Sequence, residues 1–173
     1  MIAMRKRRII VTGIVFALVI VAAGGYSWYR QTHRPFLPPA LSRSVDFTVY
    51  QPRQDTLAVN RDSISYDAAT RVLTYRASLS APRSQLTFTQ QQTPGGEGDE
   101  AIDFPAMLRK VSASHDVPTD LGTAIVYHGE SKTAGLASAI STQGTVIYIR
   151  SSQELQDTTW RLVYNKLVMA GVK

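Results

Sequence analysis

Residues 73–90 read LTYRASLSAPRSQLTFTQ, and this stretch decides the fold because apolar and polar side chains alternate on both sides of a turn. The apolar positions are Leu73, Tyr75, Ala77, Leu79, Leu86 and Phe88. A period of two places such side chains on one face of a β-strand. A proline separates the two runs at residues 81–83, so the stretch predicts two antiparallel strands joined by a short loop.

The same period marks shorter runs on either side of this pair. Before it they are 45–50, 57–59 and 64–66, and after it they are 111–115, 124–128, 136–140 and 145–149. Thr142-Gln143-Gly144 is predicted to join the last two runs as a hairpin. Because the loops are short, the sequence predicts a curved, mostly antiparallel sheet of about six or seven strands.

A helix is predicted after the last strand. An apolar stripe at i, i+3, i+4 and i+7 is formed by Trp160, Val163, Tyr164 and Leu167. Ser151 and Glu154 have the spacing of a capping box, Lys166 suits the last turn, and Gly171 suits the end of the helix. This helix is expected to pack on the sheet and complete an α+β domain. A shorter helix is predicted over residues 104–110, with a proline in its first turn.

Residues 9–28 follow another pattern, with no charged residue between Arg8 and Arg30. About 20 apolar residues match the hydrocarbon core of a bilayer, so residues 9–29 are predicted to form a transmembrane helix that meets the membrane through Ile9–Trp28. The basic residues at 5–8 outnumber those just after the run, which places the N-terminus in the cytoplasm. A cleaved secretory signal is the alternative, with a cleavage site at Ala22-Ala23-Gly24. Either interpretation exports the rest of the chain.

Four segments are therefore predicted: a basic cytoplasmic N-terminus at 1–8, a transmembrane helix at 9–29, a linker at 30–44 and an extracytoplasmic α+β domain at 45–173. Pro35, Pro38 and Pro39 stiffen the linker and favour an extended form. The remaining length suffices for one domain with a real core.

The charge of the chain is concentrated in its first segments. Six of the 19 Lys and Arg residues lie within residues 1–34, which hold no acid, so 13 basic residues face 13 acidic ones in the rest. Nucleic-acid binding usually requires a basic domain surface, and no nucleic-acid partner is predicted. The chain has no cysteine, which excludes structural disulfides and a thiol nucleophile.

No catalytic, cofactor-binding or metal-ligating residue is predicted. The three histidines, His33, His115 and His128, lack the spacing of a zinc site. Ser112, Ser131 and Asp116 lie near two of them in sequence, but triads are defined by geometry and no nucleophile elbow is present. The glycine-rich loop at 93–100 carries three acids and no phosphate-loop lysine, so a surface loop is expected there.

The aromatic residues of the domain leave two interpretations open. They either line an apolar groove that binds a lipid or an extended peptide, or fill the core beneath the helix. They are Tyr50, Tyr66, Tyr75, Phe88, Tyr127, Tyr148 and Trp160.

The order of these elements resembles a known family. An anchor precedes a meander that ends in Leu86-Thr-Phe-Thr-Gln-Gln-Gln92, and Gly144-Thr-Val-Ile-Tyr-Ile149 leads into a helix with Trp160 and Leu167. This arrangement over residues 45–170 is similar to small extracytoplasmic domains related to the lipoprotein-carrier half-barrel. The resemblance implies a curved sheet wrapped around helices and a single N-terminal anchor in a bacterial membrane. It assigns no binding residue.

Three hypotheses of function follow. The first is a non-enzymatic module of the cell envelope that binds a protein or peptide, which predicts an exposed sheet edge. The second is a lipid- or lipoprotein-binding domain, which predicts unfilled apolar volume. The third is an envelope hydrolase, which predicts histidine and serine or aspartate side chains converging in one cleft. The sequence sets no oligomeric state.

Overall fold

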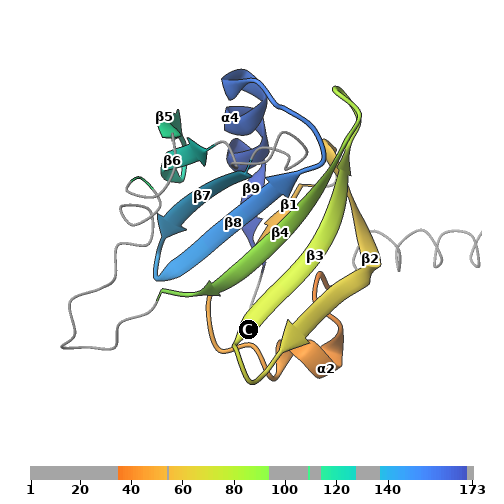
Figure 1. The fold of residues 1–173 in the computed structure, drawn as a ribbon. Helices are drawn as coiled ribbons and strands as arrows, with labels where there is room; N and C mark the ends of the chain where they lie inside the picture. The colour runs from red at the N-terminus through yellow and green to blue at the C-terminus, as the bar shows by residue number, and fades with distance from the viewer. Residues whose placement is uncertain (1–34, 54, 94–108, 110–113, 128–136, 171–173) are drawn as a thin grey trace, which may run out of the picture. The chain divides into compact units, whose positions relative to one another are not determined.

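Seven antiparallel strands form the main sheet of the protein (Figure 1). The computed structural model describes residues 35–53, 55–93, 109, 114–127 and 137–170. In spatial order the strands are β2 (Leu57–Asp67), β3 (Val72–Leu79), β4 (Ser84–Gln92), β8 (Thr145–Ser151), β7 (Ala137–Thr142), β6 (Gly122–Tyr127) and β5 (Ser114–Thr119). Every neighbouring pair is antiparallel. With the helix that follows it, this sheet confirms the predicted α+β class.

The predicted strand pair at 73–90 is confirmed as β3 and β4. Tyr75 lies opposite Phe88, and their rings stack with centroids 4.7 Å apart. The turn before β3 is closed by Asp67, whose carboxylate accepts hydrogen bonds from the Ala69 N–H at 2.9 Å and the Thr70 hydroxyl at 2.8 Å. The hairpin around residues 142–144 is also confirmed, as the β7–β8 turn.

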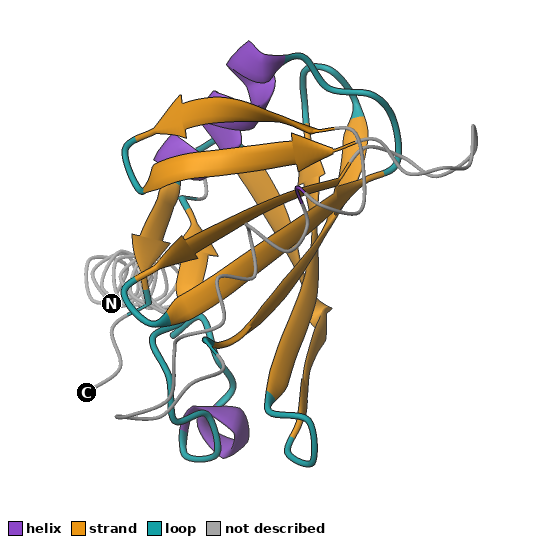
Figure 2. Cartoon of the chain, turned by 60° about the vertical axis from the view of Figure 1, so that its left-hand side comes forward, coloured by secondary structure: helices purple, strands orange, loops and turns teal. Residues whose placement is uncertain are grey.

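A second layer covers one face of this sheet. It consists of the short helix α2 (Pro39–Ser42), the helix α4 (Asp157–Asn165) and a two-stranded ribbon of β1 (Tyr50–Pro52) with β9 (Leu167–Met169). Figures 1 and 2 show α4 at one end of the sheet and α2 at the other. The core between the layers takes Trp160, Val163 and Tyr164 from α4, all without exposed surface.

The C-terminal helix differs from its prediction at both ends. Ser151 ends β8 and its hydroxyl bonds to that of Ser84 at 2.8 Å, so it does not cap the helix. The helix begins six residues later, after Gln156, without a side-chain cap. It ends at Asn165 because Leu167 and the two residues after it pair with β1 as a strand. The predicted capping box and the predicted last turn are therefore wrong.

The segment before the sheet also differs from its prediction. Phe36 and Leu37 are buried in the core, and α2 follows them, so the extended linker predicted there is wrong for these residues. Residues 45–49 are not a strand, although Val45, Phe47 and Val49 are buried in alternation. Only the end of this run pairs as a strand, in β1.

The two short runs predicted at 57–59 and 64–66 belong to one strand, β2, whose pairing with β3 shifts between Asn60 and Ser65. At this bulge a side chain satisfies main-chain groups that the interrupted pairing with β3 leaves unpaired. The Ser63 hydroxyl accepts a hydrogen bond from the Arg76 N–H at 2.8 Å and donates one to the Asn60 carbonyl at 2.6 Å. The bulge divides the sheet edge at β2 into two short pieces, which weakens it as a template for another strand.

Two predicted elements lie outside the described residues: the transmembrane helix at 9–29 and, apart from Arg109, the helix at 104–110. Within the part of the chain that the structure describes, no helix is long and apolar enough to cross a membrane.

Candidate functional site: a groove beside the β1–β9 ribbon

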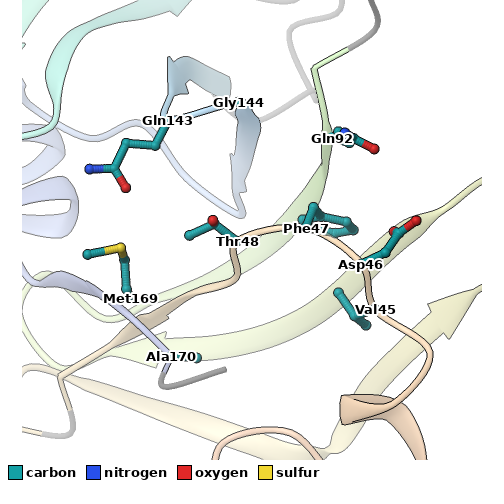
Figure 3. Close-up of a pocket in the computed structure, with 9 residues that line it drawn as sticks. All are labelled: Val45, Asp46, Phe47, Thr48, Gln92, Gln143, Gly144, Met169 and Ala170. Atoms are coloured by element: carbon teal, nitrogen blue, oxygen red, sulfur yellow. The ribbon is translucent and has the colours of Figure 1, made fainter. Parts of the chain in front are cut away.

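An open groove of about 610 Å³ lies at the end of the β1–β9 ribbon (Figure 3). It is lined by Val45, Asp46, Phe47, Thr48, Gln92, Gln143, Gly144, Met169 and Ala170. Figure 3 shows Gln143 and Met169 at one end of the groove and Asp46 and Gln92 at the other. The lining combines apolar side chains with amides and one carboxylate, which suits a ligand that carries both apolar groups and hydrogen-bonding groups.

The register of the ribbon decides which main-chain groups face the partner strand. The Ala170 N–H donates to the Val49 carbonyl at 2.7 Å, and the Arg53 N–H donates to the Lys166 carbonyl at 2.8 Å. Hydrogen-bonded pairs alternate with non-hydrogen-bonded pairs in an antiparallel ladder. Tyr50 and Met169 form a non-hydrogen-bonded pair, so their amides and carbonyls point to the two outer edges of the ribbon.

At the outer edge of β1, a buried side chain takes the place of a neighbouring strand. The Tyr50 N–H donates to Gln90 Oε1 at 2.8 Å, and Gln90 Nε2 donates to the Tyr50 carbonyl at 2.6 Å. The Tyr75 hydroxyl also donates to this carbonyl at 3.0 Å. Burial raises the pKa of Tyr75 well above the usual tyrosine value, so the hydroxyl keeps its proton. Both outward groups of Tyr50 are thus satisfied.

At the outer edge of β9, the corresponding groups of Met169 have no hydrogen-bond partner within the described part of the chain. The Met169 side chain is 56% exposed. Large hydrophobic side chains with this exposure are rare here: among the described residues the other one is Leu162, at 40%. An unpaired strand edge beside an exposed apolar side chain has the features of a peptide-binding edge.

The far wall of the groove is held by the β7–β8 turn. Gln143 and Gly144 both have positive φ, at 44° and 73°, as a two-residue hairpin turn requires. The Tyr50 hydroxyl donates to Gln143 Oε1 at 3.3 Å, and the Thr145 hydroxyl donates to the Thr48 carbonyl at 2.8 Å. These bonds fix the turn to β1 and to the segment before it, so both walls of the groove are held by the fold.

The described residues bring no catalytic group together. His115 Nε2 bonds to Asp157 Oδ1 at 2.8 Å on the surface, and Asp116 pairs with Arg109 at 2.9 Å. His128, Ser112 and Ser131 lie outside the described residues. No group of three or more potential metal ligands occurs within residues 35–53, 55–93, 109, 114–127 and 137–170.

The structure decides between the two interpretations of most aromatic residues. Tyr50, Tyr75, Phe88 and Trp160 are at most 2% exposed in the main core, so they fill it. Tyr127 and Tyr148 lie in a second apolar cluster, where their ring centroids are 5.9 Å apart. Phe47, Gln143 and Met169, which line the groove, were not singled out as a site by the sequence. The pairing of β9 with β1 creates this site, and no local pattern signals it.

Comparisons of the chain with protein-family models, curated proteins and solved structures find no match. The geometry of the groove and the sequence are therefore the observations that bear on function.

Proposed function

We propose that this protein is a non-enzymatic module of the cell envelope that binds a protein or peptide outside the membrane. Residues 9–29 anchor it as a single-pass helix, and residues 1–8 remain in the cytoplasm. The groove beside β9 receives an extended segment of the partner. The outward amide and carbonyl of Met169, which have no partner within the described residues, carry this proposal.

An added strand matches the chemistry of this edge. The main-chain groups of an extended peptide pair with those of Met169, and alternate side chains of the peptide enter the groove. Met169 offers an exposed apolar contact to those side chains, and Gln92 and Gln143 offer amides. The proposed partner is therefore a segment with at least one apolar side chain on the face that meets the groove.

The lipid-binding alternative predicts a different structural feature. A lipid requires apolar volume beneath the sheet, whereas Tyr75, Phe88 and Trp160 occupy that volume as core. This packing supports a peptide over a lipid. Native mass spectrometry of the full chain in detergent separates the two. Lipid that is lost on mild activation, as expected for a membrane anchor, agrees with the proposal, and one stoichiometric lipid that survives strong activation would contradict it.

Site-specific photo-crosslinking in intact cells tests the docking position. A photoreactive residue is placed at Met169 of the full chain, and in a matched control at Leu162, the other exposed large apolar side chain. The expected result is an adduct at position 169 that maps to one extended segment of a partner and is absent at position 162. Equal adducts at the two positions would contradict a specific edge.

The absence of cysteine allows a test of the topology. Single cysteines are introduced as Ala3→Cys before the proposed anchor and as Ser152→Cys on the exposed surface of the domain. A membrane-impermeant maleimide is expected to label position 152 in intact cells and position 3 only after lysis. Labelling of position 3 in intact cells would contradict the proposed orientation, and loss of residue 3 from the mature chain would indicate a cleaved signal.

A further inference from the structure

Two arginines occupy one row on the face of the sheet that lies opposite the α4 layer. Arg76 of β3 pairs with Thr87 of β4, and Thr87 pairs with Arg150 of β8. Residues paired across antiparallel strands share a face. With about 4.8 Å between neighbouring strands, the Cα atoms of the two arginines lie roughly 10 Å apart. These three residues are called the basic row below.

The basic row has no acidic neighbour on its own strands. β3, β4 and β8 contain two charged residues, Arg76 and Arg150, and both are exposed. Neither arginine forms an ion pair with any described residue. By contrast, Arg71, Arg109 and Lys166 each pair with an aspartate. Both charged residues that β3, β4 and β8 present on this face are therefore positive, and Asp67, opposite Val72 on the neighbouring strand β2, is the acidic residue that β2 pairs onto the same face.

On the β3 and β4 side the surroundings of the row are rich in hydroxyls and amides, whereas on the β7 side Arg150 pairs with Ala137 of the second apolar cluster. The exposed or half-exposed residues on the same face of β3 and β4 include Thr74, Ser78, Gln85, Thr89 and Gln91. Tyr148 of β8 is half-buried beside them, and burial raises the pKa of its hydroxyl while the charge of Arg150 opposes the change. The ring therefore stays neutral next to the guanidinium and presents an aromatic surface.

From these features we infer that the basic row binds an acidic glycan. The two guanidinium groups pair with carboxylates of the glycan, because an arginine fork matches a carboxylate with two parallel hydrogen bonds. The hydroxyl of Thr87 and the neighbouring amides bond to sugar hydroxyls. Anionic lipid is a poorer fit, because the exposed large hydrophobic residues of the described chain, Leu162 and Met169, lie on other elements. This site is separate from the groove beside β9.

The test measures binding of the full chain, in detergent micelles, to an oligogalacturonate. Arg76→Gln combined with Arg150→Gln is expected to raise the Kd at least tenfold, on the order expected for two charge-assisted contacts. The matched control combines Arg43→Gln with Arg53→Gln, which removes the same charge from two exposed arginines elsewhere and is expected to change the Kd less than about twofold. Thr87→Val tests the middle of the row and is expected to weaken binding by a smaller factor.

Three results would overturn the inference. Equal losses in the two double variants would show a general charge effect. Equal binding of neutral dextran would show that the arginines do not select an acid. Polyphosphate or anionic lipid vesicles binding as tightly as the glycan, with the same dependence on Arg76 and Arg150, would replace the glycan as the occupant. Because both arginines are exposed, unchanged thermal unfolding of the variants checks that the fold is intact.

Discussion

The two edges of the β1–β9 ribbon differ in how their main-chain groups are satisfied. At β1, Gln90 and Tyr75 are fully buried, and their side chains bond to both outward groups of Tyr50. At β9, Met169 is exposed and its outward groups have no partner among the described residues. The ribbon is three residues long on each strand, so two side chains are enough to satisfy the outward groups of Tyr50.

The β1 edge is closed by buried side chains and the β9 edge is open within the described part of the chain, and this difference suggests a structural role for the first and a binding role for the second. A buried backbone group without a partner costs roughly 1–3 kcal/mol, so closing the β1 edge stabilises the domain. An exposed edge can bond to water at little cost and remains available to another strand. This difference supports a structural role for Gln90 and the proposed role of the β9 edge in binding.

Gln90→Leu breaks the closed edge and has the largest expected effect. It removes both amide bonds to Tyr50 and leaves a buried N–H without a partner, so the free energy of unfolding is expected to fall by about 2–4 kcal/mol. Urea denaturation of the full chain in detergent measures the loss. Gln91→Leu is the matched control, because Gln91 lies on the opposite face of β4 and is half-exposed; a similar loss there would contradict the role of Gln90.

Alkaline pH probes the same buried layer. Burial raises the pKa of Tyr75 and of Tyr164, so both keep their protons in the folded state while the unfolded chain ionises near pH 10. Their contribution to stability is full below pH 10 and is lost above it, by up to about 1.4 kcal/mol per pH unit for each tyrosine. Denaturation midpoints measured from pH 8 to 11 should stay level and then fall; a midpoint that stays level to pH 11 would contradict the burial of these hydroxyls.

Tyr75→Phe sharpens the comparison because it removes only part of the closure. The Tyr50 carbonyl loses the hydroxyl but keeps its bond to Gln90 Nε2. The free energy of unfolding is expected to fall by about 1 kcal/mol, clearly less than for Gln90→Leu. The stability of the variant should also fall less steeply above pH 10, because one of the two buried tyrosine hydroxyls is absent. Losses of equal size in Tyr75→Phe and Gln90→Leu would show that the amide has no special role.

Met169→Lys tests the open edge and is expected to leave stability nearly unchanged, within about 0.5 kcal/mol. The side chain is exposed, so the substitution removes little buried surface. A lysine at a strand edge discourages the addition of another strand. Crosslinking to a partner from a photoreactive residue at Gln143, across the groove, should therefore be lost. Leu162→Lys is the control and should leave that adduct intact; loss in both variants would contradict the assignment.

The sequence predicted the sheet because its strands carry their signal locally. The alternation at Leu73, Tyr75 and Phe88 follows from burial of one face, and the turn residues Gln143 and Gly144 fix the last hairpin. The ribbon was missed because β1 and β9 are three residues each and lie more than a hundred residues apart. Leu167 fits a helical stripe equally well, and its pairing with Pro52 depends on the folded core.

The candidate site was missed for the same reason. Residues 90–92 are all glutamine, so the sequence does not distinguish Gln90 from its two neighbours. In the fold, Gln90 is the glutamine whose amide lies beside Tyr50. Met169 carries no motif, and its exposure follows from the end of α4 at Asn165, four residues before it. The excess charge at Arg76 and Arg150 also appears only when β4 lies between their strands.

Residue-resolved amide hydrogen exchange of the full chain in detergent tests the central claim most directly. The Tyr50 amide, bonded to Gln90 Oε1 in the core, is expected to exchange only when the domain opens, with protection close to the global free energy of unfolding. The Met169 amide is expected to exchange with little protection until a partner strand binds. Strong protection at Met169 in the free protein would show that the β9 edge is already closed and would contradict the proposed docking site.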